Sequence, residues 1–261
     1  MSYSKEEWVP AKRSLGQNFL VDENICRRIV DAVAPGPGDT LVEIGPGRGA
    51  LTGFLVEAGP ERYLTLEKDH ALAAALSRAH PGVEVIDGDA LQFDWDSLAG
   101  GQLKIAGNLP YNVASRIIWE IVHRVVGFER AIFMVQHEVA LRLAAEPGGR
   151  AYGALSAWVQ SFCRVDYLFK VPPTVFRPQP KVDSAVVRFT PRALEERPSD
   201  PDALSRLLKL CFQKRRKQLK GILKEQWSAE VEAWFADAGL SVTLRPEVLT
   251  PDQFGALSLI I

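Results

Sequence analysis

The sequence predicts an α/β fold, in which a doubly wound, mostly parallel sheet is followed by a small helical domain. Three observations support this prediction. Short β-rich runs alternate with amphipathic helical stretches from residue 39 to residue 135. A glycine-rich loop directly follows the first run, and the pattern after a proline-rich stretch at residues 191–201 is helical. Strands that alternate with helices are typical of crossover units in a parallel sheet.

Five short runs rich in apolar residues are expected to form the parallel strands. They are residues 40–44, 63–67, 83–86, 103–106 and 131–135. Three amphipathic stretches between them, residues 51–58, 70–79 and 114–126, are each long enough for a crossover helix. This order places the carboxyl ends of the strands at one edge of the sheet, where ligands bind in such folds.

Two later β-rich runs, residues 165–170 and 184–190, predict an antiparallel hairpin at one end of the sheet. The segment between them is rich in proline, so it is too stiff to form a helix. Residues 191–201 carry three prolines among charges and are expected to form a linker.

Helices are expected after the linker at residues 202–226, at residues 229–238 and from Pro251 onward. The chain should therefore contain two domains: a larger domain over residues 1–192, and a small helical domain over residues 200–261.

Composition narrows the class of protein. The 261 residues are 47% apolar and 24% charged, with no run apolar and long enough to cross a bilayer. The polar N-terminus gives no sign of secretion, so we expect a cytoplasmic protein without membrane association. Cys26, Cys163 and Cys211 are far apart and lack ligand spacing, so neither a metal site nor a disulfide is expected. A net charge of −1 and a pI near 6.5 mean that any RNA binding must depend on local charge.

The loop EIGPGRG, residues 43–49, closes a strand and opens a helix. Its glycines, Gly45 and Gly47, permit a tight turn and let a ligand approach bare backbone. Glu67 ends the next strand, where its carboxylate can accept both hydroxyls of a ribose, and Asp89 follows the third strand, where it could bind the amine of an adenine. A nucleoside-containing cofactor is indicated, although Ala50 also completes a dinucleotide fingerprint and the loop could be a purely structural turn.

The segment Asn108-Leu109-Pro110-Tyr111 follows the fourth strand and suits an aromatic amine as substrate. The lone pair of adenine N6 is delocalised into the ring, so the amine must be oriented before it attacks a methyl group. The Asn108 side-chain oxygen and the Leu109 backbone carbonyl are neutral acceptors that can do this, in a turn stiffened by Pro110. Tyr111 can stack on the base. The alternative interpretation is a structural turn with a buried tyrosine.

Residues 206–224 contain eight Lys and Arg and no acid, and their apolar residues recur at helical spacing. One face of this helix should pack, and the other should meet RNA phosphate. A solvated charged face is the alternative.

Together these segments resemble the KsgA-type ribosomal RNA small-subunit adenine N6-dimethyltransferase family over nearly the whole chain. SLGQNFLVD, residues 14–22, is similar to the family's N-terminal cofactor motif, in which Asn18 and Leu20 would contact S-adenosylmethionine. FRPQPKVDSAVVRF, residues 176–189, is similar to its last core motif, where Phe176 would close the other face of the target adenine against Tyr111.

The resemblance implies a Rossmann-like class I methyltransferase fold, with S-adenosylmethionine as methyl donor and no metal. The implied reaction is dimethylation of N6 on two adjacent adenines in a 3′-terminal hairpin loop of small-subunit rRNA. The implied partner is that rRNA within a pre-ribosomal particle, during small-subunit biogenesis. The sequence leaves the oligomeric state open, and we expect a monomer. The chain departs from the family at Gly221 and Ile222, where asparagines are expected.

Three other functions compete with this one. An Erm-type methyltransferase would modify an adenine of large-subunit rRNA, but the KVDSAVVRF segment, the linker and the basic segment favour the KsgA type. A non-enzymatic RNA-binding assembly factor would not need the acceptor pair at Asn108 and Leu109. An NAD-dependent oxidoreductase shares only the glycine loop.

Overall fold

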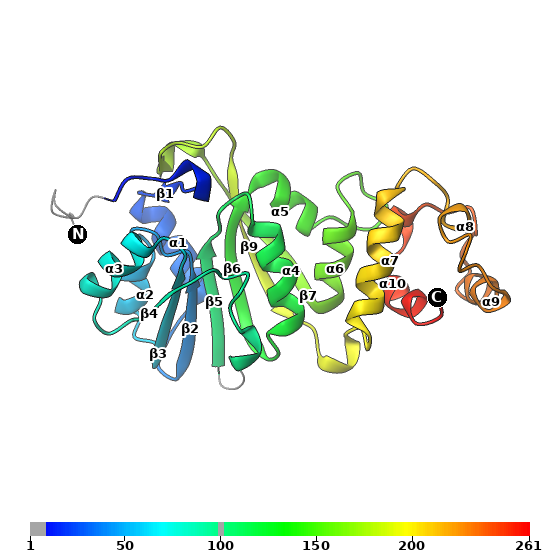
Figure 1. The fold of residues 1–261 in the computed structure, drawn as a ribbon, viewed down its shortest axis with the longest axis horizontal. Helices are drawn as coiled ribbons and strands as arrows, with labels where there is room; N and C mark the ends of the chain where they lie inside the picture. The colour runs from blue at the N-terminus through cyan, green and yellow to red at the C-terminus, as the bar shows by residue number, and fades with distance from the viewer. Residues whose placement is uncertain (1–8, 99–101) are drawn as a thin grey trace. The chain divides into compact units, whose positions relative to one another are not determined.

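The computed structural model describes residues 9–98 and 102–261. Its main feature is a seven-stranded sheet with the strand order β4-β3-β2-β5-β6-β9-β7 (Figure 1). The strands are β2 (Asp39–Ile44), β3 (Arg62–Glu67), β4 (Glu84–Asp87), β5 (Gln102–Asn108), β6 (Phe128–Gln136), β7 (Cys163–Val171) and β9 (Ser184–Pro191).

Most of the sheet is parallel. β2 pairs with β3 on one side and with β5 on the other, and β3–β4 and β5–β6 are parallel as well. β9 runs antiparallel to β6 and lies beside β7. The expected doubly wound sheet with an antiparallel end is therefore confirmed. β2 and β3 are buried along almost their whole length, as strands covered on both faces are.

Four helices accompany the parallel strands. α1 (Glu23–Val33) packs on β5 and β6, while α2 (Thr52–Glu57), α3 (His70–Ala79) and α4 (Ala114–Arg124) occupy the three expected crossover segments. Figure 1 shows α4 in front of the sheet. α1 and α3 begin at aspartate caps: Asp22 accepts from the Ile25 backbone N–H, and Asp69 accepts from that of Ala71.

The core of this part of the chain lies where α1 and α2 meet the sheet. Ile29 and Val33 of α1 and Leu55 of α2 are fully buried against Leu41 and Ile132. Burial of each such side chain contributes roughly 1.5–3 kcal/mol to the stability of this framework.

A two-stranded ribbon lies outside the main sheet. It consists of β1 (Phe19–Leu20) and β8 (Phe176–Arg177), which pair antiparallel with Leu20 opposite Phe176. The proline-rich segment before β8 forms only a short 3₁₀ turn, η4 (Pro173–Val175), in agreement with the expectation that it would not be helical. The other 3₁₀ turns are η2 (Arg13–Leu15), η3 (Trp95–Ser97), η5 (Leu194–Glu196) and η6 (Pro246–Val248).

The chain divides into two compact units. The first contains the described residues up to 140 together with 166–191, and the second contains 141–165 and 192–261. In the second unit α6 (Ala154–Phe162), α7 (Pro201–Gln213) and α10 (Pro251–Ser258) pack against one another. The remaining helices are α5 (His137–Leu143), α8 (Leu219–Ile222) and α9 (Ala229–Asp237).

These packing units differ from the expected domains, 1–192 and 200–261, in the placement of residues 141–165. They pack with the C-terminal helices because α6 is largely buried and contacts both α7 and α10. The Phe212 ring lies 6.4 Å from that of Tyr152 and 5.8 Å from that of Phe254, which joins the same parts of the chain. The functional division at the linker stays a prediction.

The prediction of one helix over residues 202–226 is wrong. α7 ends at Gln213, and a turn separates it from the short α8. The apolar stripe that holds α7 in the core stops at Cys211 and Phe212, and the four residues after Gln213 are all basic. A helix continued through them would have no apolar anchor and would crowd like charges, so the chain turns until Leu219 is buried.

Among the described residues, no helix is both long and apolar enough to span a membrane. The same residues contain no group of three or more His, Cys, Asp or Glu side chains arranged to hold a metal ion.

Candidate active site at the carboxyl edge of the sheet

A cavity opens at the carboxyl ends of the parallel strands of the first unit. Its volume is about 1100 Å³, counting the open solvent at its mouth. It is lined by the segment before β1, by the glycine loop after β2, and by the residues that follow β3, β4 and β5. Ten of the eleven site residues expected from the sequence line it, namely Asn18, Leu20, Gly45, Gly47, Glu67, Asp89, Asn108, Leu109, Pro110 and Tyr111.

The glycine loop adopts a backbone that requires glycine. Gly45, Gly47 and Gly49 have φ angles of 65°, 56° and 74°, which side chains with a Cβ rarely adopt. A Cβ on Gly47 would also lie 3.0 Å from the ring of Phe19. The loop therefore presents bare backbone to the cavity, as an approaching ligand needs.

Glu67 ends β3 and is almost completely buried. Its carboxylate accepts hydrogen bonds from the backbone N–H of Gly47 (3.0 Å) and of Asp69 (2.8 Å). Burial raises the pKa of Glu67, although these two bonds oppose the rise. The carboxylate is fixed between the glycine loop and the β3–α3 turn, and its remaining lone pairs can accept the hydroxyls of a ribose.

Asp89 follows β4 and lines the same cavity. Its carboxylate accepts from Lys68 Nζ (2.7 Å) and from the Leu91 backbone N–H (3.0 Å). Partial burial opposes ionisation, but these bonds and the Lys68 charge hold the pKa of Asp89 below its usual range. An ionised acceptor is therefore available here for an amine.

The segment that follows β5 is anchored at several points. Asn108 Nδ2 donates to the Asn18 carbonyl (3.0 Å), and the Leu109 N–H donates to the Met134 carbonyl (3.1 Å). The Pro110 carbonyl accepts from the first residues of α4. Because the Asn108 side-chain nitrogen is already bound to the Asn18 carbonyl, the side-chain oxygen is the atom that can accept a hydrogen bond from a substrate amine.

Tyr111 is half-buried and its hydroxyl lies 2.5 Å from the hydroxyl of Ser184, at the buried start of β9. Burial raises the pKa of Tyr111, and the bond to Ser184 opposes the rise. The ring is therefore held as a neutral phenol at the cavity wall, where it can stack on a flat ligand.

Phe176 is the one expected site residue that does not line the cavity. Its side chain is 0% exposed and packs in the core beside Val171 and Val186. Phe176 lies in β8, opposite Leu20 of β1, and both side chains belong to the same apolar core.

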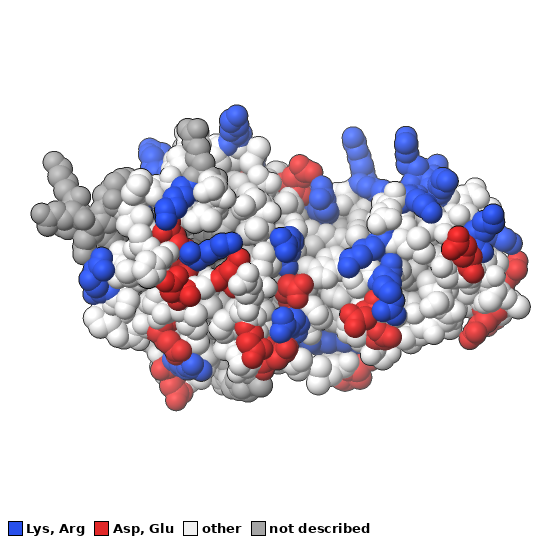
Figure 2. Space-filling model, in the orientation of Figure 1, with Lys and Arg blue, Asp and Glu red and all other residues white. Residues whose placement is uncertain are grey.

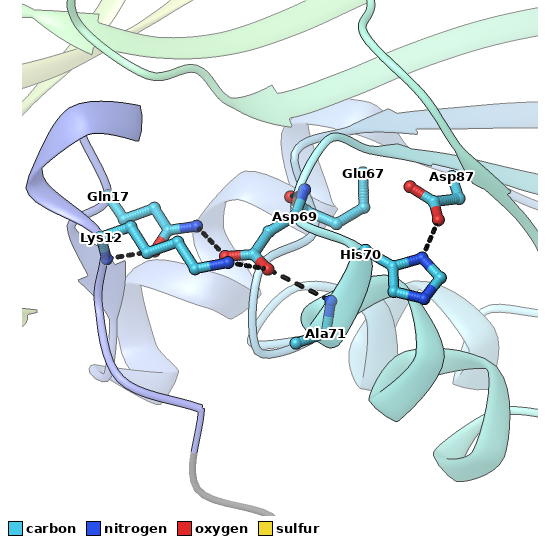
Figure 3. Close-up of polar contacts among 7 residues, drawn as sticks. All are labelled: Lys12, Gln17, Glu67, Asp69, His70, Ala71 and Asp87. Atoms are coloured by element: carbon cyan, nitrogen blue, oxygen red, sulfur yellow. Dashed lines mark hydrogen bonds and ion pairs between the residues drawn. The ribbon is translucent and has the colours of Figure 1, made fainter.

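Three residues that sequence analysis did not single out contact one another beside the site, and one of them, Gln17, lines the cavity. Asp69 accepts from Lys12 Nζ (2.7 Å) and from Gln17 Nε2 (3.1 Å), and Figure 3 shows both side chains pointing toward it. An aspartate before a helical run is an ordinary N-cap, and Asp69 does cap α3. The local sequence pattern therefore gave no sign of its further contacts with Lys12 and Gln17.

The arrangement can hold a nucleoside beside an aromatic amine. Acceptors for a ribose and for an adenine amine lie on one side, and a neutral amide with a tyrosine ring lies on the other, in one cavity. This fits S-adenosylmethionine, because bare glycine backbone and the Glu67 carboxylate meet where its nucleoside would lie.

The chain matches a family model described as ribosomal RNA adenine dimethylase over residues 9–260. Ribosomal RNA small subunit methyltransferase A of Maridesulfovibrio salexigens is 55% identical to it over 248 residues, covering 95% of this chain and 94% of that protein. The protein of the same name from Chlorobium chlorochromatii is 44% identical over 251 residues, covering 95% and 93%.

Two solved structures share the fold. The 23S rRNA methyltransferase ErmE has a TM-score of 0.70 and 26% identity, with 93% of this chain and 98% of that chain covered. A dimethyladenosine transferase from Plasmodium falciparum has a TM-score of 0.76 at 24% identity, with 92% and 95% covered. The family model spans nearly all of the chain, and both bacterial relatives match it almost from end to end. The chain therefore belongs to the ribosomal RNA adenine dimethylase family.

Proposed function

We propose that this chain dimethylates N6 of two adjacent adenines in a 3′-terminal hairpin loop of small-subunit rRNA, with S-adenosylmethionine as methyl donor. One observation carries the proposal: the Asn108–Tyr111 segment lines the same cavity as the glycine loop, Glu67 and Asp89. The small-subunit assignment is supported by the bacterial relatives, whose names specify that subunit. We further propose that it acts as a cytoplasmic monomer on a pre-ribosomal particle during small-subunit biogenesis.

The cofactor would be held by the residues at one end of the cavity. Glu67 would accept the ribose hydroxyls, Asp89 would accept the adenine amine, and Gly45 and Gly47 would let the backbone approach closely. Asn18 and Leu20 would contact the cofactor from the segment before α1. When bound, S-adenosylmethionine supplies an electrophilic methyl group on its sulfonium.

The target amine would be oriented by two neutral acceptors, the Asn108 Oδ1 atom and the Leu109 carbonyl. Hydrogen bonds to both N–H groups turn the nitrogen lone pair toward the methyl group and favour the positive charge that develops on nitrogen. A methylated N6 is acidic while cationic, so it loses its proton without a strong base. Positioning therefore accounts for most of the rate.

Stacking on the base is assigned first to Tyr111, a contact worth roughly 1–3 kcal/mol. A second stacking contact from Phe176 stays a prediction. It requires the ring to leave the core, which costs roughly the 1.5–3 kcal/mol that its burial contributes. Single-stranded loops are the RNA segments whose bases are most easily extruded into such a pocket.

The RNA-binding surface is proposed to lie in residues 200–261, around the turn between α7 and α8. The apolar face of α7 is buried, whereas Lys214, Arg216 and Lys217 of the turn are exposed. Figure 2 shows Lys and Arg side chains gathered on this part of the molecule. Arg215 has a different role, because it donates to the Arg150 carbonyl (2.9 Å) and pairs with Glu247 (3.7 Å).

The decisive experiment is methyl transfer from labelled cofactor to small and large ribosomal subunits that lack the modification. We expect dimethyladenosine in small-subunit rRNA only. The likeness to ErmE makes large-subunit rRNA the second candidate substrate. Label confined to the large subunit would reject the proposal in favour of that candidate, and absence of label in both subunits would favour a non-catalytic assembly factor.

A further inference from the structure

The chain segment 9–20, here called the N-terminal strap, forms one wall of the cavity. Its residues 14–20 line the cavity, yet its regular structure is limited to η2 and the two residues of β1. A segment with so few backbone hydrogen bonds of its own depends on contacts with the rest of the fold for its position.

The two ends of the strap are tied to the glycine loop. Arg48 donates to the Val9 carbonyl (2.7 Å), and its guanidinium lies over the Phe19 ring, 4.2 Å from the centroid. The Phe19 ring in turn packs against Gly47 so closely that a Cβ there would approach it to 3.0 Å.

The middle of the strap is tied to a single buried carboxylate. The Asp69 side chain is 0% exposed and accepts from Lys12 Nζ (2.7 Å) and Gln17 Nε2 (3.1 Å). Gln17 Oε1 accepts from the Lys12 backbone N–H (2.7 Å), which closes a ring of hydrogen bonds (Figure 3). Burial opposes the charge, but Lys12 and Gln17 hold the pKa of Asp69 below its usual range.

Asp69 is linked to both functional ends of the cavity, to one directly and to the other through the strap. Its backbone N–H donates to Glu67 Oε1 (2.8 Å), which holds the carboxylate proposed to bind the ribose. Through the strap it acts on the other end, because the Asn18 carbonyl accepts from Asn108 Nδ2 and fixes the amide that orients the target amine. Residues 14–20 form one wall of the cavity, so displacement of the strap at this middle attachment would widen the cavity for a cofactor.

We propose that Asp69 is a positioning residue that latches the N-terminal strap over the bound cofactor through Lys12 and Gln17. Release of this latch opens the cavity for exchange of S-adenosylmethionine and its product, and closure restores the Asn18–Asn108 contact. The inference rests on the proposed binding of that cofactor in this cavity. Neither Lys12 nor Asp69 touches the reacting atoms, so their effect is on affinity and cofactor exchange.

Asp69→Asn separates the latch from the helix cap. Asparagine caps helices as well as aspartate does, so α3 should be kept. The substituted amide loses the charge that holds Lys12. Asp200→Asn is the matched control, because Asp200 caps α7 in the same way by accepting from the Ala203 N–H (2.8 Å) and lies in the second packing unit. Lys12→Met tests the other partner of the ion pair.

The test measures the Kd of S-adenosylmethionine by calorimetry and the steady-state KM and kcat for methyl transfer. We expect Asp69→Asn and Lys12→Met each to raise the cofactor Kd and KM about 5- to 10-fold, since a partly exposed ion pair with one hydrogen bond is lost. kcat at saturating cofactor should change less than about twofold, because the bound cofactor itself returns the strap to its place. The double variant should be no weaker than the worse single variant.

Trypsin cleavage at Lys12 provides a readout of the strap itself. In Asp69→Asn it should be faster than in wild type, and added cofactor should slow it. A cofactor Kd equal to that of wild type in Asp69→Asn, or a lower melting temperature without a change in Kd, would overturn the latch. Failure of the wild-type protein to bind S-adenosylmethionine at all would overturn the proposed function and the latch with it.

Discussion

Asn108 uses the two ends of its amide for different contacts. Its nitrogen donates to the Asn18 carbonyl across 90 residues of sequence, and its oxygen is the acceptor proposed for the adenine amine. Aspartate at this position would lose the donor and would place a negative charge beside the developing cation. The amide thus combines a structural bond with an uncharged acceptor, which neither alanine nor aspartate can do.

Replacing Asn108 with alanine should lower the rate of methyl transfer by about 100-fold or more, since a preorganised acceptor at the reacting nitrogen is lost. RNA binding should survive. Single-turnover transfer and RNA titration measure the two effects. Asn24→Ala, an exposed position on α1, is the matched control and should keep the wild-type rate. An Asn108→Ala rate equal to that of wild type would show that the orientation mechanism is wrong.

Two substitutions at Tyr111 separate its ring from its hydroxyl. Tyr111→Phe removes the bond to Ser184 but keeps the stacking face, so the KM for RNA should change only a few-fold. Tyr111→Ala removes the ring, and the loss of roughly 1–3 kcal/mol predicts a KM or kcat/KM penalty of about 5- to 150-fold. If both variants behave alike, the ring does not stack on the substrate.

β2, α2 and β3 are joined under the glycine loop by one carboxyl group. Glu43 Oε2 accepts from Thr52 Oγ1 (2.7 Å) and from Tyr63 Oη (2.6 Å), and the side chain is almost completely buried. Burial raises the pKa of Glu43 to about 7, and the two hydrogen bonds only partly oppose this. The elements on either side of the glycine loop are thus joined by the Glu43 carboxyl group, which gains a negative charge near neutral pH.

The pKa of Glu43 predicts a pH dependence of stability. The folded-state pKa lies above the unfolded value, so the folded state binds the proton more tightly. Protonation of Glu43 makes its full contribution to folding stability below pH 4.5, and this contribution is lost as the pH rises through about 7. Glu43→Gln should not show this loss of stability, so its free energy of unfolding should rise relative to that of wild type between pH 5 and 8. Urea denaturation measures the difference. A constant difference between the two proteins over that range would refute the assignment.

The local sequence pattern predicted most of the helices and strands. It failed where a segment has no apolar contact with the rest of the fold. The five parallel strands and three crossover helices follow the apolar periodicity that a strand or helix buries in the sheet layers. The helix expected through residues 202–226 breaks after Gln213, because the basic turn has no apolar contact to hold it. Propensity alone does not show this, since lysine and arginine are good helix formers.

The two packing units divide the proposed tasks. The cavity belongs to the first unit, and the basic turn after α7 belongs to the second. No cavity residue comes from the second unit in the part of the chain that the structure describes. Cofactor binding and phosphate binding should therefore respond to different substitutions.

Neutralising Lys214, Arg216 and Lys217 together to glutamine should weaken RNA binding and reduce its salt dependence. The slope of log Kd against log salt should fall by roughly two to three, if each side chain neutralises one phosphate. The cofactor Kd should stay at the wild-type value. Arg27, Arg62 and Arg78, all exposed in the first unit, provide a matched triple control. An equal loss of cofactor affinity would mean that the turn is structural.

The order of strands, the glycine loop, the NLPY segment and the family resemblance were all accessible from residues close together along the chain. Each depends on a short sequence pattern, such as apolar periodicity, an asparagine at the end of a strand, or a glycine like Gly47, which adopts a positive φ angle. Short-range stereochemistry constrains these features wherever they occur, so they predict the sheet and the segments that surround its carboxyl edge.

Contacts between residues far apart in the sequence could not be predicted from such local patterns. Asp69 contacts Lys12 across 57 residues, Asn108 contacts Asn18 across 90, and Phe176 is buried in the core beside Leu20. Each of these outcomes depends on which surfaces become adjacent once the apolar core has formed, and many partners satisfy the same local pattern. Apolar packing selects among them, which is why the fold alone decided the strap, its latch and the burial of Phe176.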